Sequence, residues 1–229
     1  MLTESQSLDP LVASLRTGER SPAALIDYCT GRIDAVEDDV RALVPESGRR
    51  SRLRREAEAL AARYDDPAAR PPLYGVPVGV KDIFHVDGFR TKAGSSGPPA
   101  AITGRESVAV RRLLDAGALH LGKTHTTEFA YFEPAPTRNP HDPGHTPGGS
   151  SSGSAAAVAA GMCPLALGSQ TVGSVVRPAA FCGIVGFKPS HDRIPLDGVV
   201  PFSPTVDHVG TFTADVAGAA RAASVLCDG

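Results

Sequence analysis

The sequence GGSSSGS at residues 148–154 runs directly into AAAVAAG at residues 155–161. Three glycines and four serines in seven residues allow a tight turn that is rich in backbone amides and hydroxyls. The alanine-rich continuation favours a helix, so this turn is expected at a helix N-terminus. A segment of this kind can bind an anion or carry out serine chemistry, and we expect the rest of the chain to be organised around it.

The local pattern leaves several interpretations of this stretch open. A phosphate-binding loop is disfavoured, because no lysine stands where it would reach the phosphates. A nucleophile elbow fits G-x-S-x-G centred on Ser151, and its partners would be Asp192 or Asp197 and then His208. The elbow must follow a strand, however, whereas residues 138–147 are rich in Pro, His and Asn. A flexible glycine–serine linker does not usually continue into a helical Ala/Val run. The motifs on either side of this stretch are therefore needed to choose between the interpretations.

Composition indicates an ordinary soluble globular chain. The 229 residues are 41% hydrophobic and 21% charged, which is enough for one sizeable core. A net charge of −2 gives no excess of positive charge of the kind that favours binding to nucleic acid or an anionic membrane. With no signal-like segment and no apolar run long enough to span a bilayer, we expect a cytoplasmic protein. We expect a single domain overall, with a helical cover at residues 1–70 and an α/β core at residues 71–229.

The cysteines and histidines do not suggest a metal centre. The four cysteines are widely spaced and lack a C-x-x-C pair, so they are interpreted as reduced, mostly buried small side chains: Cys29, Cys163, Cys182 and Cys227. His141 and His145 are four residues apart but lie among prolines and glycine rather than on a helix. We therefore expect no metal and no organic cofactor.

Hydrophobic spacing predicts alternating helices and strands. Ser21 and Pro22 supply a helix N-cap and first-turn proline. Helical spacing is found at residues 9–15, 23–36, 51–64, 107–117, 155–161 and 215–226. Strands are predicted within residues 73–84, at 119–123 and 165–167, and within 184–190. This alternation indicates an α/β protein.

A single cation, Lys81, interrupts the apolar run at residues 73–84. Such a lysine is most often an exposed strand residue. If Lys81 is buried, however, desolvation lowers its pKa from about 10.4 towards neutrality, and a neutral amine is a competent general base. Its role therefore depends on a partner elsewhere in the chain.

A second glycine and hydroxyl cluster follows the predicted strand at residues 165–167. With it, three motifs stand in order: GVPVGVKD at 75–82, GGSSSGSAAAVAAG at 148–161, and GSQTVGSVVRPAAFCGIVGFKPS at 168–190. Together they resemble the amidase signature family of serine hydrolases, and the resemblance extends from about residue 9 to the C-terminus. The resemblance implies a mixed β-sheet core covered by helices on both faces, incomplete on the C-terminal side because family members continue past residue 229.

The resemblance also implies roles for individual residues. Ser174 corresponds to the nucleophile, Ser150 to the cis-peptide bridging serine, and Lys81 to the terminal base. The oxyanion hole corresponds to the backbone amides of Thr171, Val172, Gly173 and Ser174. Residues expected to contact substrate are Gly149, Ser151 and Gln170. A serine hydroxyl needs a base to remove its proton, and one hydroxyl can relay between the nucleophile and a neutral lysine.

Val172 and Arg177 flank Ser174 in the sequence and affect the expected geometry of its loop. Val172 stands where the family usually has Gly or Ala, and a β-branched side chain would be strained there if the position requires a positive φ. Arg177 is expected to hold the loop through hydrogen bonds to carbonyl groups, with contact to a substrate carboxylate as the alternative.

The expected activity is hydrolysis of a small-molecule amide by acyl transfer. One alternative is the glutamine-dependent amidotransferase component of the same family, although Gln170 stands where such proteins usually have Asp. Another is a non-catalytic binding or assembly module that has kept the scaffold. A short chain with an exposed sheet edge would associate with a second copy or with a complementing C-terminal chain.

Overall fold

The computed structural model describes residues 1–97 and 102–228. Its helices are α1 (Leu8–Thr17), α2 (Pro22–Val40), α3 (Arg49–Arg63), α4 (Val108–Asp115), α5 (Ser152–Ala159), α6 (Val176–Cys182) and α7 (Val216–Leu226). Its strands are β1 (Pro77–Lys81), β2 (Leu119–Thr124), β3 (Leu165–Gln170), β4 (Val185–Phe187) and β5 (His208–Thr213). No helix in the described ranges is both long and apolar enough to cross a membrane.

The five strands form one mixed sheet in the order β2-β1-β3-β5-β4. β1 runs parallel to both β2 and β3, whereas β5 runs antiparallel to β3 and β4. β1 and β3 therefore end at the same edge of the sheet, and the segments that follow them meet there. This edge brings Lys81 close to the two glycine and hydroxyl clusters.

Helices cover both faces of this sheet. Gly168 of β3 faces the start of α5, since a Cβ built on it would lie 2.8 Å from Ser151 Oγ. Thr213 of β5 faces α7, because its hydroxyl donates to Asp215 O at 2.8 Å. Gly168 pairs with Gly210 and therefore shares a face of the sheet with it. Thr213 is three residues further along β5, and because side chains alternate between faces along a strand, it lies on the opposite face. α5 and α7 therefore cover opposite faces. The predicted α/β architecture with two covered faces is confirmed.

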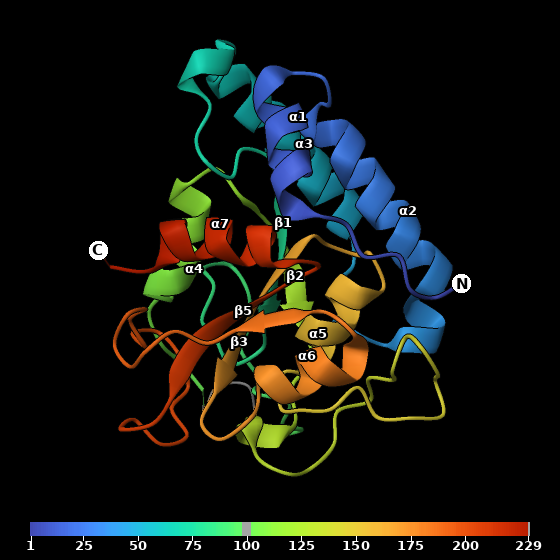
Figure 1. The fold of residues 1–229 in the computed structure, drawn as a ribbon, viewed down its shortest axis with the longest axis vertical. Coiled ribbons are helices and arrows are strands. Elements are labelled where there is room, and N and C mark those ends of the chain that lie inside the picture. Colours follow the sequence, from blue (N-terminus) through green and yellow to red (C-terminus); the bar gives the residue numbers. More distant parts are fainter. Residues whose placement is uncertain (98–101, 229) are drawn as a thin grey trace.

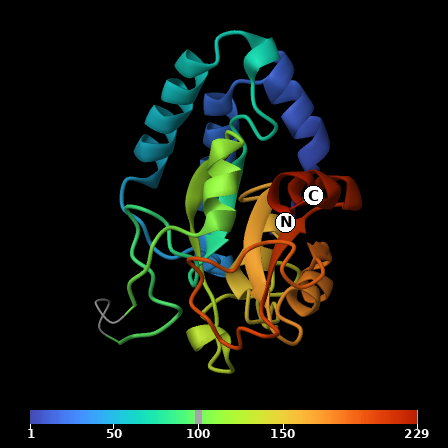
Figure 2. The same cartoon turned by 90° about the vertical axis from the view of Figure 1, so that its left-hand side faces the viewer.

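The N-terminal helices α1, α2 and α3 stand together at one end of the molecule, coloured blue to teal in both ribbon views (Figures 1 and 2). α2 begins as the sequence predicts, with Pro22 in the first turn and the Ser21 hydroxyl accepting a hydrogen bond from Ala24 N at 3.1 Å. Leu8, Leu15 and Leu25 are fully buried in the same cluster of apolar side chains as the strands. The long loops gather at the opposite end (Figure 1).

α5 is buried along its whole length and consists only of Ser, Gly, Ala and Val. Its close packing requires small side chains: a Cβ on Gly153 would lie 2.2 Å from Ala42 O and 2.5 Å from His125 N. The helix contacts β1, β2, β3 and β5. The predicted helix is confirmed, but it begins at Ser152, three residues earlier than the sequence suggests. Three of the four cysteines are buried, as expected.

Two elements were not predicted. The helix α6 starts two residues after Ser174, and strand β5 lies beside β3 in the sheet. β3 also extends to Gln170, three residues further than predicted. The two missed elements, α6 and β5, and the longer β3 all adjoin the segment around Ser174.

Candidate active site

Lys81 is the last residue of β1, and its side chain is completely buried. The alternative of an exposed strand residue is therefore wrong. Burial in apolar surroundings disfavours the ammonium form and lowers the pKa of Lys81 to about 7, against a smaller raising effect of the Asp207 carboxylate. Near neutral pH, Lys81 can therefore exist as an amine that takes up a proton.

Two hydroxyls hold the Lys81 amino group. Lys81 Nζ lies 2.8 Å from Ser150 Oγ and 2.8 Å from Ser169 Oγ. Ser150 precedes α5 and is joined to Gly149 by a cis peptide bond, as the sequence resemblance implies. Ser169 belongs to β3, and sequence reasoning did not select it although it lies within the third motif. Its place near the C-terminal end of a buried strand parallel to β1 was the available signal.

Ser174 lies on the turn between β3 and α6, and it is 9% exposed. Within the part of the chain that the structure describes, Ser174 Oγ has no hydrogen-bond partner, so the structure joins Lys81 to Ser150 but not Ser150 to Ser174. The backbone amides of residues 171–174 likewise donate to no other described residue. These four successive amides are therefore free to donate, which is the property that an oxyanion hole requires.

Side chains at both ends of this turn hold its backbone in place. Gln170 Oε1 accepts hydrogen bonds from Val175 N at 2.9 Å and Val176 N at 3.0 Å. Arg177 donates two hydrogen bonds to Gly149 O, at 3.0 Å from Nε and 2.6 Å from Nη2. The structural role expected for Arg177 is confirmed, and it ties the two glycine and hydroxyl clusters together. A substrate contact by Gln170 or Gly149 stays a prediction.

Val172 does not have a positive φ, so the strain considered for a β-branched residue at this position does not arise. Its side chain is 87% exposed and points away from the core. The valine is therefore compatible with the backbone geometry of the turn.

The nucleophile elbow centred on Ser151 does not fit the structure. Ser151 is fully buried, and its hydroxyl exchanges hydrogen bonds with the backbone of Ser169, donating to the carbonyl at 3.2 Å and accepting from the amide at 3.3 Å. The segment before it is a loop rather than a strand. His208 Nδ1 lies 2.8 Å from Val206 O instead of beside Ser151. Contact between substrate and Ser151 stays a prediction of the resemblance.

A second buried lysine, Lys123 of β2, was not singled out by the sequence. Its Nζ forms an ion pair with Asp82 Oδ1 at 3.0 Å and donates to Phe84 O at 2.6 Å and Thr91 Oγ1 at 3.2 Å. Burial lowers the pKa of Lys123, while the Asp82 carboxylate raises it. The pair fixes the chain directly after Lys81 and compensates the charge of Asp82.

We expect Lys123→Met to destabilise the fold by about 3–5 kcal/mol, because it leaves the Asp82 carboxylate buried without a cation. Urea unfolding at pH 7 measures the free energy. The double variant Asp82→Asn with Lys123→Met should recover part of that loss, since no unpaired charge remains. A single variant as stable as the wild type would contradict the compensating role of this pair.

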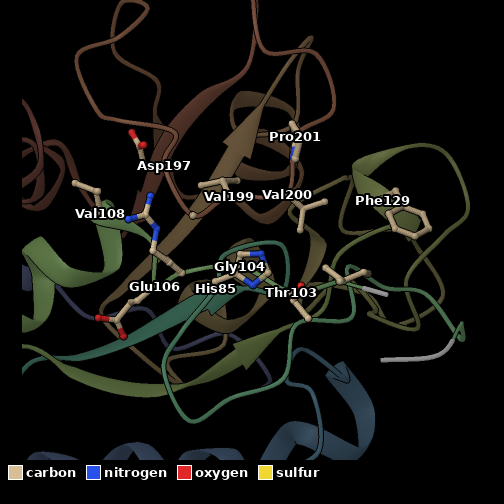
Figure 3. Close-up of a pocket in the computed structure, with 13 residues that line it drawn as sticks. His85, Thr103, Gly104, Glu106, Val108, Phe129, Asp197, Val199, Val200 and Pro201 are labelled. Carbon is tan, nitrogen blue, oxygen red and sulfur yellow. The ribbon is translucent and has the colours of Figure 1, made fainter. Parts of the chain in front are cut away.

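One cavity lies beside the segment that follows β1, and another lies beside the Gly149–Ser150 peptide. The larger, about 720 Å3, is bounded by His85, Glu106, Asp197 and Phe129 among others, and Figure 3 shows these side chains around it. Neither Lys81 nor Ser174 lines it. A smaller cavity of about 270 Å3 is lined by Gly149 and Arg177, next to the Gly149–Ser150 peptide. The smaller cavity is thus the one that adjoins the candidate site.

The family model for amidases matches residues 24–229. The chain belongs to the amidase family. The resemblance seen in the three motifs is therefore confirmed, and the mixed sheet with its buried helix α5 is the amidase fold.

Several relatives of this amidase chain are known. It is 41% identical over 222 residues to a glutamyl-tRNA(Gln) amidotransferase subunit from Synechococcus sp. (strain WH7803), covering 93% of this chain and 44% of that protein. It is 38% identical over 222 residues to the AtzE subunit of 1-carboxybiuret hydrolase from Pseudomonas sp. (strain ADP), covering 93% and 48%. Peptide amidase from Stenotrophomonas maltophilia superposes with a TM-score of 0.88 at 32% identity, over 98% of this chain and 48% of that one.

The chain spans about half the length of these relatives. The three catalytic candidates implied by the motifs, Lys81, Ser150 and Ser174, fall within this half.

Proposed function

We propose that this amidase chain hydrolyses a small-molecule amide by acyl transfer to Ser174. The observation that carries the proposal is the buried Lys81 amine, held 2.8 Å from Ser150 Oγ. A lysine with a pKa of about 7 is matched to proton transfer at neutral pH. The family membership and the proximity of the Ser174 turn to Gly149, through Arg177, support the same assignment.

In the proposed first step, Ser174 Oγ attacks the amide carbonyl carbon. Its proton passes to Ser150 Oγ while Ser150 gives its own proton to Lys81 Nζ. This transfer requires a hydroxyl rotation or small movement that brings Ser174 Oγ to Ser150, and catalytic hydrogen bonds commonly tighten when substrate binds. The products of this step are a tetrahedral oxyanion and the Lys81 ammonium.

The oxyanion is then held by the amides of residues 171–174. Each well-placed donor of this kind contributes about 3 kcal/mol in the transition state. Collapse of the intermediate breaks the C–N bond, and the leaving amine takes the proton back from Lys81 through Ser150. Water attacks the acyl-enzyme by the same proton route, which releases the carboxylic acid and restores Ser174.

The proposal makes a direct prediction about pH. Because only neutral Lys81 accepts a proton, the rate of covalent labelling of Ser174 by a fluorophosphonate should rise about tenfold per pH unit below about 7 and level off above it. Intact-mass measurement of the second-order labelling rate from about pH 5 to pH 9 tests this. Peptide mapping of the adduct must place it on Ser174.

Two results would count against the proposal. If the folded wild-type protein acquires no adduct at any pH, this 229-residue chain has no active serine nucleophile. A labelling rate that does not change across this pH range would exclude Lys81 as the base. The exposed lysine variant Lys92→Met is the matched control and should retain the wild-type profile.

A second candidate function is that of a glutamine-dependent amidotransferase component. It is favoured by the 41% identity to the Synechococcus protein of that name. Gln170 argues against it, since its side-chain oxygen is bound to the amides of Val175 and Val176. Release of ammonia from glutamine, compared with release from simple carboxamides, distinguishes the two activities. A binding or assembly module would instead bind an amide without acylating Ser174.

We further propose a cytoplasmic enzyme that associates with a second copy or a complementing chain. Several large apolar side chains on the loops near Ser174 are exposed, including Phe132 at 74% and Val172 at 87%. Two of the relatives are named as subunits. The proposed mechanism itself uses only side chains and backbone amides of this chain and involves no cofactor.

A further inference from the structure

Asp207 is a buried carboxylate close to the candidate site that neither the motifs nor the mechanism above uses. It lies immediately before β5 and is 7% exposed. Its Oδ1 accepts a hydrogen bond from the Thr171 hydroxyl, and its Oδ2 accepts from Phe202 N at 2.9 Å and Ser203 N at 2.8 Å. Both oxygens are therefore bound to neutral donors, and no cationic side chain of the described residues forms an ion pair with it.

The strand register explains why Asp207 contacts the turn that carries Ser174. β3 and β5 are antiparallel, and Gln170 pairs with His208. Because the strands are antiparallel, Thr171, which follows Gln170, lies opposite Asp207, which precedes His208. The Asp207 carboxylate therefore contacts the first residue of the 171–174 segment. Gln170 binds the amides at the far end of the same segment. The four unbonded amides thus lie between two side-chain anchors.

The Asp207 carboxylate lies on the same side of the sheet as the Lys81 amino group, because it binds Thr171 whereas Lys81 binds Ser169, two residues earlier in the chain. The other elements around Lys81 supply few charges: β3 and the start of α5 present the hydroxyls of Ser169 and Ser150, and Asp82 is already paired with Lys123. Asp207 alone raises the pKa of Lys81, in opposition to burial. His208 follows Asp207 in sequence, and its ring packs edge-on against His191 at 5.3 Å between ring centroids.

We propose that Asp207 is a positioning residue for acyl transfer: through the Thr171 hydroxyl it aims the amides of residues 171–174, and its charge supports the Lys81 ammonium that forms during attack. This inference rests on the proposed function. Asp207 donates and accepts no proton in the reaction. It acts through Thr171 and through its electrostatic field, and both effects favour the charge-separated transition state.

Two substitutions separate these effects. Thr171→Val removes the hydroxyl that binds Asp207 but keeps its charge, whereas Asp207→Asn removes the charge at nearly constant volume. We expect Thr171→Val to lower the plateau labelling rate of Ser174 by about tenfold to a hundredfold without moving the pH midpoint. Asp207→Asn should lower the plateau as well and move the midpoint to lower pH by about one unit, because Lys81 then lacks its supporting anion.

The experiment combines labelling rates with a direct titration of Lys81. The Lys81 Cε resonance is followed by 13C NMR between about pH 5 and pH 10 in the wild type, both variants and the exposed control Asp115→Asn. Backbone 15N relaxation of residues 172–174 reports the order of the turn and should show greater motion in Thr171→Val. The conservative variant Thr171→Ser keeps the donor and should restore both the backbone order and labelling, while Asp115→Asn should match the wild type throughout.

The outcomes are decisive in either direction. An unchanged Lys81 midpoint in folded Asp207→Asn would overturn the electrostatic role, and wild-type backbone relaxation and labelling in Thr171→Val would overturn the aiming role. If the wild type acquires no adduct, the proposed function fails. The Lys81 titration and the backbone relaxation still decide the role of Asp207 in that case, because neither measurement depends on turnover.

Discussion

Replacing Ser174 by alanine is expected to abolish fluorophosphonate labelling and to lower amide turnover by about 10⁴- to 10⁶-fold. Ser174 Oγ is nearly buried, has no hydrogen-bond partner among the described residues, and is followed in the proposed mechanism by Ser150 and Lys81 as the proton route. The loss should appear in kcat, since the deleted atom forms a bond during the reaction.

The fold should tolerate this change. Ser174 Oγ has no hydrogen-bond partner among the described residues, so removing it leaves no buried group unsatisfied, and the free energy of unfolding should change by less than about 1 kcal/mol. Ser190→Ala, at an exposed serine on the loop after β4, is the matched control and should label like the wild type. Persistent labelling of Ser174→Ala at another serine would show that the nucleophile has been misassigned.

The second large effect is expected for Lys81→Met, which removes the base but keeps an unbranched side chain. Labelling should slow by about 10²- to 10⁴-fold and lose its dependence on pH near 7. Rates measured at about pH 6 and pH 8 suffice, because the wild type should differ between them and the variant should not. A variant that retains the wild-type pH profile would show that another group titrates.

Lys81→Met also changes how stability depends on pH. In the wild type, the folded state loses the Lys81 proton near pH 7, whereas the unfolded chain keeps it until about pH 10.4. Between these values the unfolded state binds more protons, so this lysine makes folding more favourable as pH rises. Urea unfolding at about pH 7.5 and pH 9.5 should therefore favour the wild type increasingly over the variant at the higher pH.

Local sequence was sufficient to predict the helix α5, the strand carrying Lys81 and the cap of α2. Each depends on the immediate neighbours: an Ala-rich run, an apolar Val/Gly segment and a Ser-Pro pair. The burial of Lys81 could not be decided in this way. A lone lysine in an apolar strand fits either environment, and its burial depends on the tertiary packing around β1, to which α5 and the neighbouring strands contribute.

The omissions have different origins. α6 is only seven residues long, with Pro178 in its first turn, and Val175 and Val176 weaken its helical pattern. β5 has a local signal, since Val, Thr and Phe favour strands, but only its pairing with β3 places it in the sheet. Ser169 and Asp207 gain importance from tertiary contacts that no local pattern encodes. Sequence motifs thus identified the candidate reacting residues, whereas the groups that position them required the fold.

The tight burial of α5 has a consequence for how such sequences diverge. Its small residues fill a space in which Gly153 has no room even for a methyl group. Selection for a folded chain alone would therefore retain this glycine, serine and alanine stretch after a loss of turnover. Under the proposed mechanism, a descendant that had lost Ser174 would still carry this stretch, so divergence at Lys81 and Ser174 would separate working from silent copies better than the glycine-rich stretch does.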